Sequence, residues 1–360
     1  MGKRRIQVIG PDPERSQGGM ATVIRNQLNS AELSSRYDIS MHPSFVDGPL
    51  IKRAVFSCSQ EFAFMRQAHD FDVYHVHICS GTSTWRKARY IRALGDQTGR
   101  VVLHVHGARY HEFFDGASEP QRARIRALYG SVGRVVVLSE EWLNVFVERE
   151  ICDPEKIAVV YNAVEIPDDP GVDYAGHRVL FMGRLDERKN PDVLLRAAAE
   201  LLPEYPDARF TFGGDGDVPK YRNLAAKLGI ADSCSFLGWV SGKSKDRLFR
   251  SNDVYCLPSK NEGMPMSVLE AMAYGLATVT TPVGGIPQVI RDGSSGLFVP
   301  VSDHVALADV LRELFDSEDA RRSIGMAGRA VVKERFGMEA FTSKLAAIYE
   351  DVALQRRANN

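Results

Sequence analysis

Short apolar runs alternate with helical stretches along the whole chain, and this alternation limits the possible folds more than any other feature. Residues 6–10 form the first run, and a glycine-containing loop and a helical stretch from about Met20 follow it. Strands that alternate with helices at this spacing form parallel sheets with helices on both faces. The sequence therefore predicts an α/β fold of doubly wound sheets. The other runs expected to form strands are residues 72–77, 101–105, 134–138, 157–160, 179–182, 209–212, 235–237, 254–257, 278–280 and 296–299.

A stretch rich in Pro, Gly and Asp at residues 162–173 interrupts this alternation and is typical of a linker. Because 360 residues exceed the size of one ordinary core, we expect two Rossmann-like domains, residues 1–165 and 166–336. Residues 337–360 are expected to form a final helix that packs back on the first domain. Sheets of this kind bind ligands at the carboxyl ends of their strands, so the loops that follow the strands are the first place to look for function.

The composition excludes several classes of protein. The chain is 44% hydrophobic and 25% charged, as globular proteins are, and no apolar run approaches the ~18 residues of a membrane span. A net charge of −1 gives no bulk attraction to nucleic acid. The apolar stretch near the N-terminus is too short for a signal peptide, so we expect a cytoplasmic protein. The cysteines form no Cys-x-x-Cys pair, which suits a reducing compartment and argues against a structural zinc; they are Cys58, Cys79, Cys152, Cys234 and Cys256.

The stretch Asn-Glu-Gly-Met-Pro-Met-Ser-Val-Leu-Glu-Ala-Met-Ala at residues 261–273 has the most informative pattern. It follows a buried-strand run, and its composition becomes helical from Pro265, which suits a first helical position. The unpaired N–H groups and the dipole of such a helix start favour a phosphate. Glu262 precedes the helix and Glu270 lies one to two turns inside it, so the two carboxylates are not placed like a glycosidase pair that flanks one bond.

Three further loops have residues that suit an anionic ligand. Gly18 and Gly19 lie between the first strand and the first helix, without the Gly-x-Gly-x-x-Gly of a dinucleotide site. Arg184 and Lys189 lie in one loop and suit a diphosphate, although Glu187 and Arg188 beside them also fit a solvated turn. Asp215 lies in a similar strand-end loop, Gly-Gly-Asp-Gly. The segment 238–244 fails the P-loop spacing, so we exclude a P-loop.

Two His-x-His strands suggest a metal site, because alternate residues of a strand share a face. They comprise His75 with His77 and His104 with His106. No carboxylate or third histidine has a ligand spacing in the sequence, so we expect no metal here. His106, at the end of its strand, is the better candidate for ligand contact, and His75 and His104 are expected to be hydrogen-bonded core residues.

Together these motifs resemble glycosyltransferase family 4, a large family of retaining enzymes with the GT-B fold. The resemblance covers nearly the whole chain. Its most specific part is the pair of glutamates, Glu262 and Glu270, within Glu-Gly-x-Pro and Leu-Glu-Ala-Met-Ala. Gly18-Gly19, His106, Arg184 with Lys189, the Gly-Asp-Gly at 214–216 and the Gly-Gly-Ile-Pro at 284–287 support it.

The resemblance implies two doubly wound Rossmann-like domains that face each other across a cleft, the second of which binds a nucleotide sugar. Glu270 is expected to hold the ribose and Glu262 the donor sugar, while Arg184, Lys189 and backbone N–H groups hold the diphosphate. His106 and the Gly18-Gly19 loop are expected to reach the donor from the first domain. The family needs no metal or other cofactor. By this analogy the catalytic residues are His106, Glu262, Arg184 and Lys189, and the donor-binding residues are Gly18, Gly19, Asp215, Gly263, Met264, Pro265, Val268 and Glu270.

The sequence departs from the common family pattern at Ala163, Asn190 and Gln288, and Gln288 bears on details of the donor site. The expected reaction is transfer from a UDP- or GDP-sugar to a glycan or lipid-linked acceptor, in capsule, exopolysaccharide or other cell-surface glycan assembly. A non-catalytic sugar-nucleotide-binding subunit and an epimerase of the same fold are the alternatives. Basic and aromatic residues at 51–66 and 85–92 favour weak attachment to an anionic membrane, or else helices packed on the sheet with solvated arginines.

Overall fold

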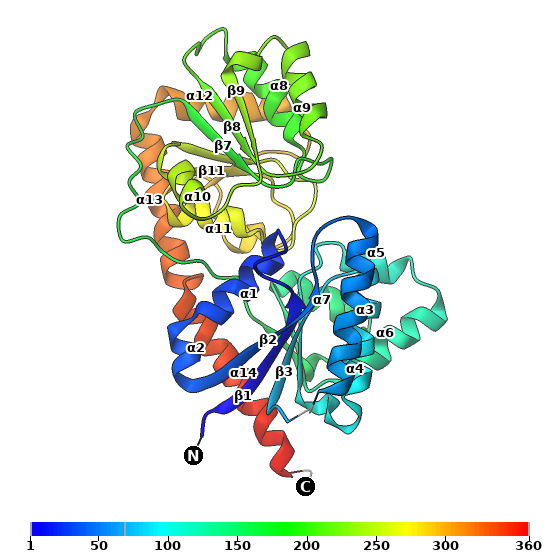
Figure 1. The fold of residues 1–360 in the computed structure, drawn as a ribbon. Helices are drawn as coiled ribbons and strands as arrows, with labels where there is room; N and C mark the ends of the chain where they lie inside the picture. Colours follow the sequence, from blue (N-terminus) through cyan, green and yellow to red (C-terminus); the bar gives the residue numbers. More distant parts are fainter. Residues whose placement is uncertain (1, 68–69, 359–360) are drawn as a thin grey trace. The chain divides into compact units, whose positions relative to one another are not determined.

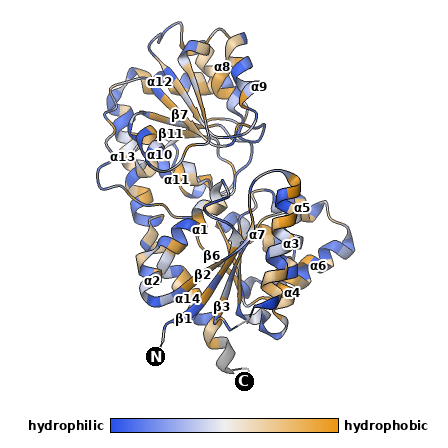
Figure 2. Ribbon diagram, viewed as in Figure 1, coloured by the Kyte–Doolittle hydropathy of each residue, from blue (hydrophilic) through white to orange (hydrophobic). Residues whose placement is uncertain are grey.

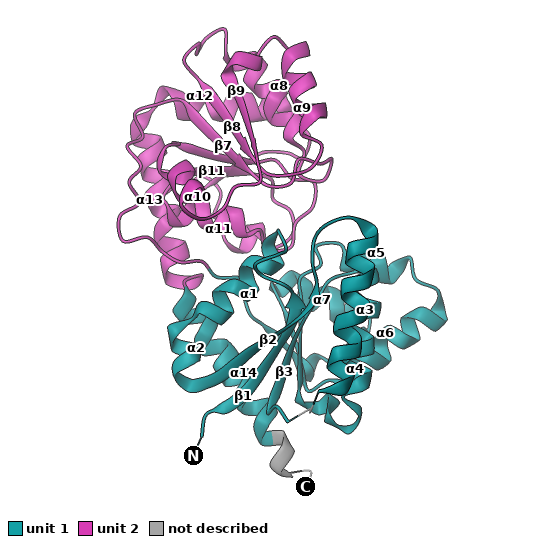
Figure 3. Ribbon diagram, in the orientation of Figure 1, with its two compact units in different colours: residues 1–163, 338–360 teal, residues 164–337 magenta. Residues whose placement is uncertain are grey.

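The computed structural model describes residues 2–67 and 70–358, with side chains described as far as Leu354. The chain forms two compact units, which Figure 3 shows in different colours. Unit 1 comprises residues 1–163 and 338–360, and unit 2 comprises residues 164–337. Each unit is organised around one six-stranded sheet in which all neighbouring strands are parallel. The predicted α/β fold with two doubly wound sheets is confirmed.

The sheet of unit 1 has the order β2-β1-β3-β4-β5-β6. All residues of β3 and β4 are buried, because helices cover both faces of the sheet (Figure 1). The strands are β1 (Arg4–Pro11), β2 (Tyr37–Phe45), β3 (Val73–Ile78), β4 (Val101–Val105), β5 (Arg134–Val137) and β6 (Ile157–Val159). The helices are α1 (Gly19–Asn29), α2 (Ala31–Arg36), α3 (Leu50–Arg66), α4 (Thr82–Ala93), α5 (Tyr110–Asp115), α6 (Glu119–Ser131), α7 (Glu140–Glu148) and α14 (Met338–Ala358), with short 3₁₀ turns η1 (Gly95–Arg100) and η2 (Pro154–Lys156).

The last helix, α14, belongs to unit 1 although it follows unit 2 in the sequence. It contacts β3, β4, α2 and η1. The phenol of Tyr349 is fully buried there, and Tyr37 packs edge-on against its ring, with 5.5 Å between the ring centroids. Tyr349 thereby brings α14 into the core next to β3, which is important for the histidines described below.

The sheet of unit 2 has the order β12-β11-β10-β7-β8-β9. Its strands are β7 (Arg178–Met182), β8 (Arg209–Gly213), β9 (Cys234–Gly238), β10 (Val254–Leu257), β11 (Ala277–Thr280) and β12 (Leu297–Phe298). Its helices are α8 (Pro191–Leu201), α9 (Val218–Lys227), α10 (Gly242–Arg250), α11 (Met266–Ala273), α12 (His304–Asp316) and α13 (Glu318–Arg335), with 3₁₀ turns η3 (Ala231–Ser233) and η4 (Ile286–Gln288).

Two details differ from the prediction. The sequence pattern does not predict β2, which contains Pro43 and lies at the edge of its sheet, paired only with β1. Pro265 is not the first helical residue; its backbone is extended, with φ −70° and ψ 119°, and α11 begins at Met266. Two findings bear on the compartment and membrane expectations. The five cysteines are all free, and none of the helices in the described ranges is long and apolar enough to cross a membrane.

Candidate functional site

The strand order of unit 2 places two of the predicted loops side by side. From β7 the chain moves outward in one direction to β8 and β9, whereas β10 pairs with the other side of β7. Ligands of doubly wound sheets bind at such a reversal, beyond the carboxyl ends of the two central strands. The loop after β7 holds residues 183–190, and the loop after β10 holds residues 258–265. The topology thus joins Lys189 and Glu262, which are far apart in the sequence.

Glu262 is the centre of a buried ion-pair cluster. Lys189 Nζ donates to Glu262 Oε1 at 2.6 Å, and Arg188 Nη1 donates to Glu262 Oε2 at 3.2 Å. The hydroxyl of Ser259 donates to Glu262 Oε1 at 2.6 Å. The Glu262 side chain is only 5% exposed. Arg188 and Ser259 are functional candidates that the sequence analysis missed, and Arg188 does not lie in a merely solvated turn.

The charges of this cluster are set by burial and by the neighbouring cations. Burial alone would raise the pKa of Glu262, but Lys189, Arg188 and the hydrogen bond from Ser259 outweigh it and hold that pKa below its usual value. Burial lowers the pKa of Lys189, and the carboxylate of Glu262 opposes that effect. Lys189 has three N–H donors and gives one of them to Glu262. A further anion beside Lys189 can therefore be bound without breaking the ion pair.

Glycines hold the loops around Glu262 in contact with one another. Gly284 has φ +59°, and a Cβ added there would lie 1.9 Å from the carbonyl oxygen of Glu262. Gly285 N–H donates to the carbonyl oxygen of Gly263 at 2.7 Å. Gly214 has φ +157°, and its Cβ would lie 1.8 Å from the carbonyl oxygen of Gly183. Glycine is needed at these positions because a side chain would collide with the neighbouring loop. This requirement is separate from any need for a ligand to approach the backbone closely.

Arg184 and Asp215 lie on the two loops that this glycine contact joins. Arg184 Nη1 donates to Asp215 Oδ2 at 2.6 Å, and the Arg184 side chain is 58% exposed. The backbone N–H of Leu185 donates to the carbonyl oxygen of Asp215 at 2.6 Å, which fixes the register of the two loops. Arg184 therefore presents an accessible guanidinium in the loop that leads to Lys189.

Glu270 lies on α11 and carries an unused acceptor. Lys245 Nζ, on α10, donates to Glu270 Oε1 at 2.5 Å. The second oxygen, Oε2, is buried and has no hydrogen-bond partner within the described residues. A buried carboxylate oxygen without a donor is costly, so Glu270 differs in this respect from the fully paired Glu262. The sequence contains no signal for Lys245, which lies 25 residues earlier on a different helix.

The start of α11 follows the Glu262 loop directly. Pro265 precedes the helix, and its carbonyl oxygen accepts from the N–H of Val268 at 3.2 Å. The N–H of Val268, one of the predicted phosphate donors, is therefore already in use. Gly263, Met264 and Val268 are all buried, so they form the floor of the loop. The first helical N–H groups have no acceptor within the helix and remain available for a phosphate.

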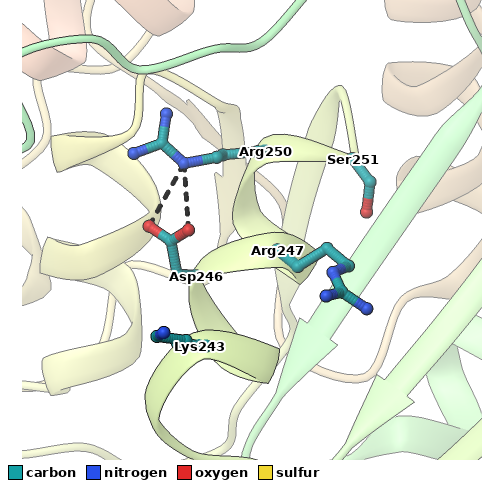
Figure 4. A pocket seen from close by; sticks show the side chains of 5 residues that line it. All are labelled: Lys243, Asp246, Arg247, Arg250 and Ser251. Atoms are coloured by element: carbon teal, nitrogen blue, oxygen red, sulfur yellow. Dashed lines mark hydrogen bonds and ion pairs between the residues drawn. The ribbon is translucent and has the colours of Figure 1, made fainter.

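A separate hollow of about 520 Å³ lies on the α10 side of unit 2 (Figure 4). Its lining is mainly basic, but Arg250 is already paired with Asp246, with Nε 3.1 Å from Oδ2. Asp246 also accepts from the hydroxyl of Tyr274 at 2.5 Å. Neither Glu262 nor Glu270 lines this hollow, so it is not the site defined by the two glutamates. The lining residues are Lys243, Asp246, Arg247, Arg250 and Ser251.

In unit 1 the predicted glycines lie at the start of α1. Gly18 has φ +105° and precedes the helix, and Gly19 is its first residue. Among the described residues, no side chain caps this helix end, and a Cβ added at Gly18 would meet no atom within 4 Å. The positive φ of Gly18 explains the glycine locally.

The parallel pairing of β3 with β4 brings four histidine rings of unit 1 into contact. They belong to His75, His77, His104 and His106. His77 lies opposite His104 in the register. His77 Nδ1 is 2.8 Å from His106 Nε2, and His75 Nε2 is 3.1 Å from His104 Nδ1. Burial lowers the pKa values of His75 and His106 to about 3, so these rings are neutral at pH 7.

The expectation that no third histidine has a ligand spacing is wrong. Ligand nitrogens of His75, His77 and His104 all lie within 4.8 Å of one another, because strand pairing replaces sequence spacing. The rings nevertheless stack, with interplanar angles of 6° to 28°. In-plane lone pairs of stacked rings point in parallel planes and do not converge on one point. His104 is a buried residue hydrogen-bonded through Nδ1, as expected, and its buried Nε2 has no partner within the described residues.

Both parts of the chain match known enzyme families. Residues 165–331 match the family described as Glycosyl transferases group 1, and residues 18–166 match that described as Glycosyltransferase Family 4. Phosphatidyl-myo-inositol mannosyltransferase of Mycobacterium tuberculosis H37Rv is 32% identical over 308 residues, which cover 79% of this chain and 75% of that protein. D-inositol 3-phosphate glycosyltransferase of Corynebacterium aurimucosum is 30% identical over 308 residues, covering 78% of this chain and 72% of that protein.

Solved structures with the same architecture cover nearly the whole chain. Sucrose-phosphate synthase from Thermosynechococcus elongatus superposes with a TM-score of 0.78 at 18% identity, covering 99% of this chain and 100% of that one. Alr3699/HepE of Anabaena, solved with UDP-glucose, superposes with a TM-score of 0.74 at 16% identity, covering 96% and 99% of the two chains. At these identities the likeness establishes the fold, and it confirms the predicted GT-B architecture.

Proposed function

The chain belongs to glycosyltransferase family 4, and on that basis we propose that it is a retaining, metal-independent enzyme that transfers a sugar from a UDP- or GDP-sugar to a glycan or lipid-linked acceptor. The observation that carries the proposal is the pair of glutamates around the start of α11. Glu262 holds Lys189 at 2.6 Å, and one buried oxygen of Glu270 has no partner among the residues that the structure describes.

Each part of a nucleotide sugar finds a chemically suited group in unit 2. The unpartnered Oε2 of Glu270 accepts a ribose hydroxyl. The diphosphate is bound by Lys189, by the accessible Arg184 and by the first backbone N–H groups of α11, those of Met266 and Ser267. As the bond to the sugar breaks, negative charge grows on the diphosphate, and these fixed positive groups stabilise it without a metal ion. Glu262 accepts from hydroxyls of the transferred sugar.

The names of two relatives suggest a chemical class for the acceptor. One is named for a phosphatidyl-linked inositol and the other for an inositol phosphate, so a polyol that carries a phosphate or a lipid is the acceptor class we favour. The setting proposed for this reaction is the assembly of a capsule, an exopolysaccharide or another cell-surface glycan on the cytoplasmic side of a membrane.

Helix α3 supports a weak contact with an anionic membrane surface. Several of its apolar side chains are at least half exposed, which is unusual for an amphipathic helix on a sheet. Figure 2 shows apolar colouring along parts of α3. The sequence of this helix also contains the basic residues Lys52, Arg53 and Arg66. A helix with this mixture lies on anionic lipid with its apolar side chains inserted. The exposed apolar residues are Leu50, Ile51, Val55, Phe62 and Met65.

Binding of the purified protein to liposomes tests the membrane contact. We expect binding to anionic but not to neutral liposomes at low salt, and we expect Ile51→Glu with Val55→Glu to abolish it. Met326→Glu replaces an exposed apolar residue of unit 2 and serves as the matched control. Failure of the wild-type protein to bind anionic liposomes at low salt contradicts this part of the proposal.

A thermal-unfolding panel with UDP-, GDP- and ADP-sugars, with and without EDTA, tests the donor. A donor at about 100 times its dissociation constant adds about 2.7 kcal/mol to the free energy of unfolding. We expect one nucleotide class to stabilise the protein and EDTA to have no effect. Transfer with the same anomeric configuration in donor and product supports the retaining mechanism. Binding without transfer to any acceptor favours a non-catalytic subunit, and interconversion of the free donor favours an epimerase.

A further inference from the structure

One hydrogen-bonded chain in unit 1 connects a buried glutamine to His106. Gln27 lies on α1 and is fully buried. Gln27 Oε1 is 2.9 Å from His77 Nε2, and His77 Nδ1 is 2.8 Å from His106 Nε2. The sequence analysis expects His106 to contact the sugar donor but gives no role to Gln27 or His77. Their geometry nevertheless determines what His106 can offer to a ligand.

The rings in this chain are neutral, so each has one nitrogen that donates and one that accepts. Burial and the neighbouring imidazoles hold the pKa of His77 well below its usual value, and burial lowers the pKa of His106 to about 3. A carbonyl oxygen only accepts, so the proton of His77 lies on Nε2 and faces Gln27 Oε1. His77 Nδ1 then accepts, and the proton of the second hydrogen bond belongs to His106 Nε2.

The other end of the Gln27 amide contacts Tyr349 and His75, and the amide nitrogen lies on that side. Gln27 Nε2 donates to the hydroxyl of Tyr349 at 2.5 Å and lies 2.8 Å from His75 Nδ1. Burial raises the pKa of Tyr349, so its phenol keeps its proton, and this hydroxyl lies 2.5 Å from His75 Nδ1. With the amide nitrogen on this side, two donors meet His75 Nδ1, which is then an acceptor. The reversed amide would place an oxygen there and would reverse every proton along the chain.

We propose that Gln27, oriented by Tyr349 of α14, is a positioning residue that acts through His77 to place the proton of His106 on Nε2 and leave Nδ1 as its acceptor. His106 follows β4 at the carboxyl edge of the sheet and is partly exposed. Its ring thus accepts a hydrogen bond from a hydroxyl of the sugar donor or acceptor and does not donate one. The identity of this ligand rests on the proposed glycosyltransferase function, whereas the tautomer of His106 does not depend on it.

Long-range proton–nitrogen NMR of the ¹⁵N-labelled protein measures the tautomer directly, with His106 assigned from the signal that is missing in His106→Asn. We expect the protonated Nε2 form in the wild-type protein at pH 7. Gln27→Met removes the acceptor at nearly constant volume and should give a mixture of both tautomers. Gln27→Glu keeps an acceptor toward His77 and should retain the Nε2 form.

A buried glutamine that takes no part in this series of hydrogen bonds provides the control. Gln7, on β1, is 4% exposed, and its Oε1 accepts from Gln67 Nε2 at 3.0 Å. Gln7→Met should leave the tautomer of His106 unchanged. If the protein transfers sugar, Gln27→Met should lower kcat/KM by about tenfold or more, as loss of a residue that orients a histidine typically does, and Gln27→Glu should restore most of it.

The NMR result and the activity separate the two claims. An Nε2-protonated His106 that becomes mixed in Gln27→Met supports the relay even if no sugar transfer is found, in which case the proposed function fails alone. A proton on Nδ1 of His106 in the wild-type protein overturns the relay, as does a tautomer that is unchanged in folded Gln27→Met. The wild-type measurement decides the matter should Gln27→Met not fold.

Discussion

Lys189 and Glu262 form a 2.6 Å ion pair in which the side chains are only 11% and 5% exposed. They come from the loops after β7 and β10, the two strands at which the sheet of unit 2 reverses its order. Such a buried pair is difficult to replace one partner at a time, because the remaining charge is left without compensation. The pair is therefore both a structural element and the proposed location of the donor diphosphate.

Lys189→Met tests the structural part of this pair. We expect the free energy of unfolding to fall by about 3 kcal/mol or more, since Glu262 would remain buried after losing its closer cationic partner and keeping the pair with Arg188. Urea unfolding measures the change. Glu204→Gln removes the exposed pair with Arg312 and should change stability by less than about 1 kcal/mol. Equal effects of the two substitutions would contradict the account.

Glu270→Gln tests the unpartnered oxygen. Lys245 should keep the amide oxygen, so the amide nitrogen replaces Oε2 and turns an acceptor into a donor. We expect the dissociation constant of the nucleotide sugar to rise about tenfold or more, as measured by calorimetry. Glu318→Gln, which removes a surface pair with Arg322, is the control. Unchanged donor affinity in Glu270→Gln would show that Oε2 does not bind the ribose.

Gly284→Ala tests the contact between loops. The new Cβ would lie 1.9 Å from the carbonyl oxygen of Glu262 at a φ of +59°, so the Glu262 loop has to move. Gly229 has a similar φ of +72° but open space around its Cβ position, so Gly229→Ala isolates the backbone strain. We expect about 1–2 kcal/mol of destabilisation in Gly229→Ala and clearly more in Gly284→Ala, by urea unfolding. Similar destabilisation in both variants would mean that the contact between the loops at Gly284 does not contribute to stability.

The stacked histidines predict a dependence of stability on pH. The pKa of His104 is held well below its usual value by burial and by His106 and His75, whereas in the unfolded chain it is about 6.5. Below pH 6.5 the unfolded chain binds more protons, so stability is fully present above that pH and falls as the pH decreases.

Comparison with His104→Asn measures this contribution. Urea unfolding between pH 6 and pH 5 should show a slope that is shallower by up to about 1.4 kcal/mol per pH unit in the variant. The measurement is made on the difference between the two proteins, so that carboxylates common to both cancel. An unchanged slope would mean that His104 is protonated in the folded protein.

The sequence predicts most of the architecture because parallel strands covered on both faces are nearly continuous apolar runs. Runs such as 101–105 and 254–257 coincide with β4 and β10. β2 has no such run, because it is an edge strand with alternating burial and a proline. β2 forms because it pairs with β1, and a local sequence pattern carries no information about that pairing.

The sequence indicates those candidate residues that belong to a recognisable motif. It does not indicate residues whose importance depends on a partner far away in the sequence. Glu262, Glu270 and Lys189 are indicated by motif and loop position. No motif marks Lys245 on α10 or Gln27 on α1. Their partners, Glu270 on α11 and Tyr349 on α14, are distant in the sequence and are known only from the fold. The proximity of three histidines likewise depends on the β3–β4 register, which places His77 opposite His104 and brings His75 within hydrogen-bond distance of His104.

Release of nucleoside diphosphate in the presence of EDTA tests the proposed function most directly. The purified protein is incubated with the donor selected by the thermal panel, without acceptor, and the released diphosphate is measured. We predict slow release that persists in EDTA and disappears in Glu262→Ala, provided that the variant is folded. Absence of release from every donor that binds, or release that persists in folded Glu262→Ala, would contradict the account.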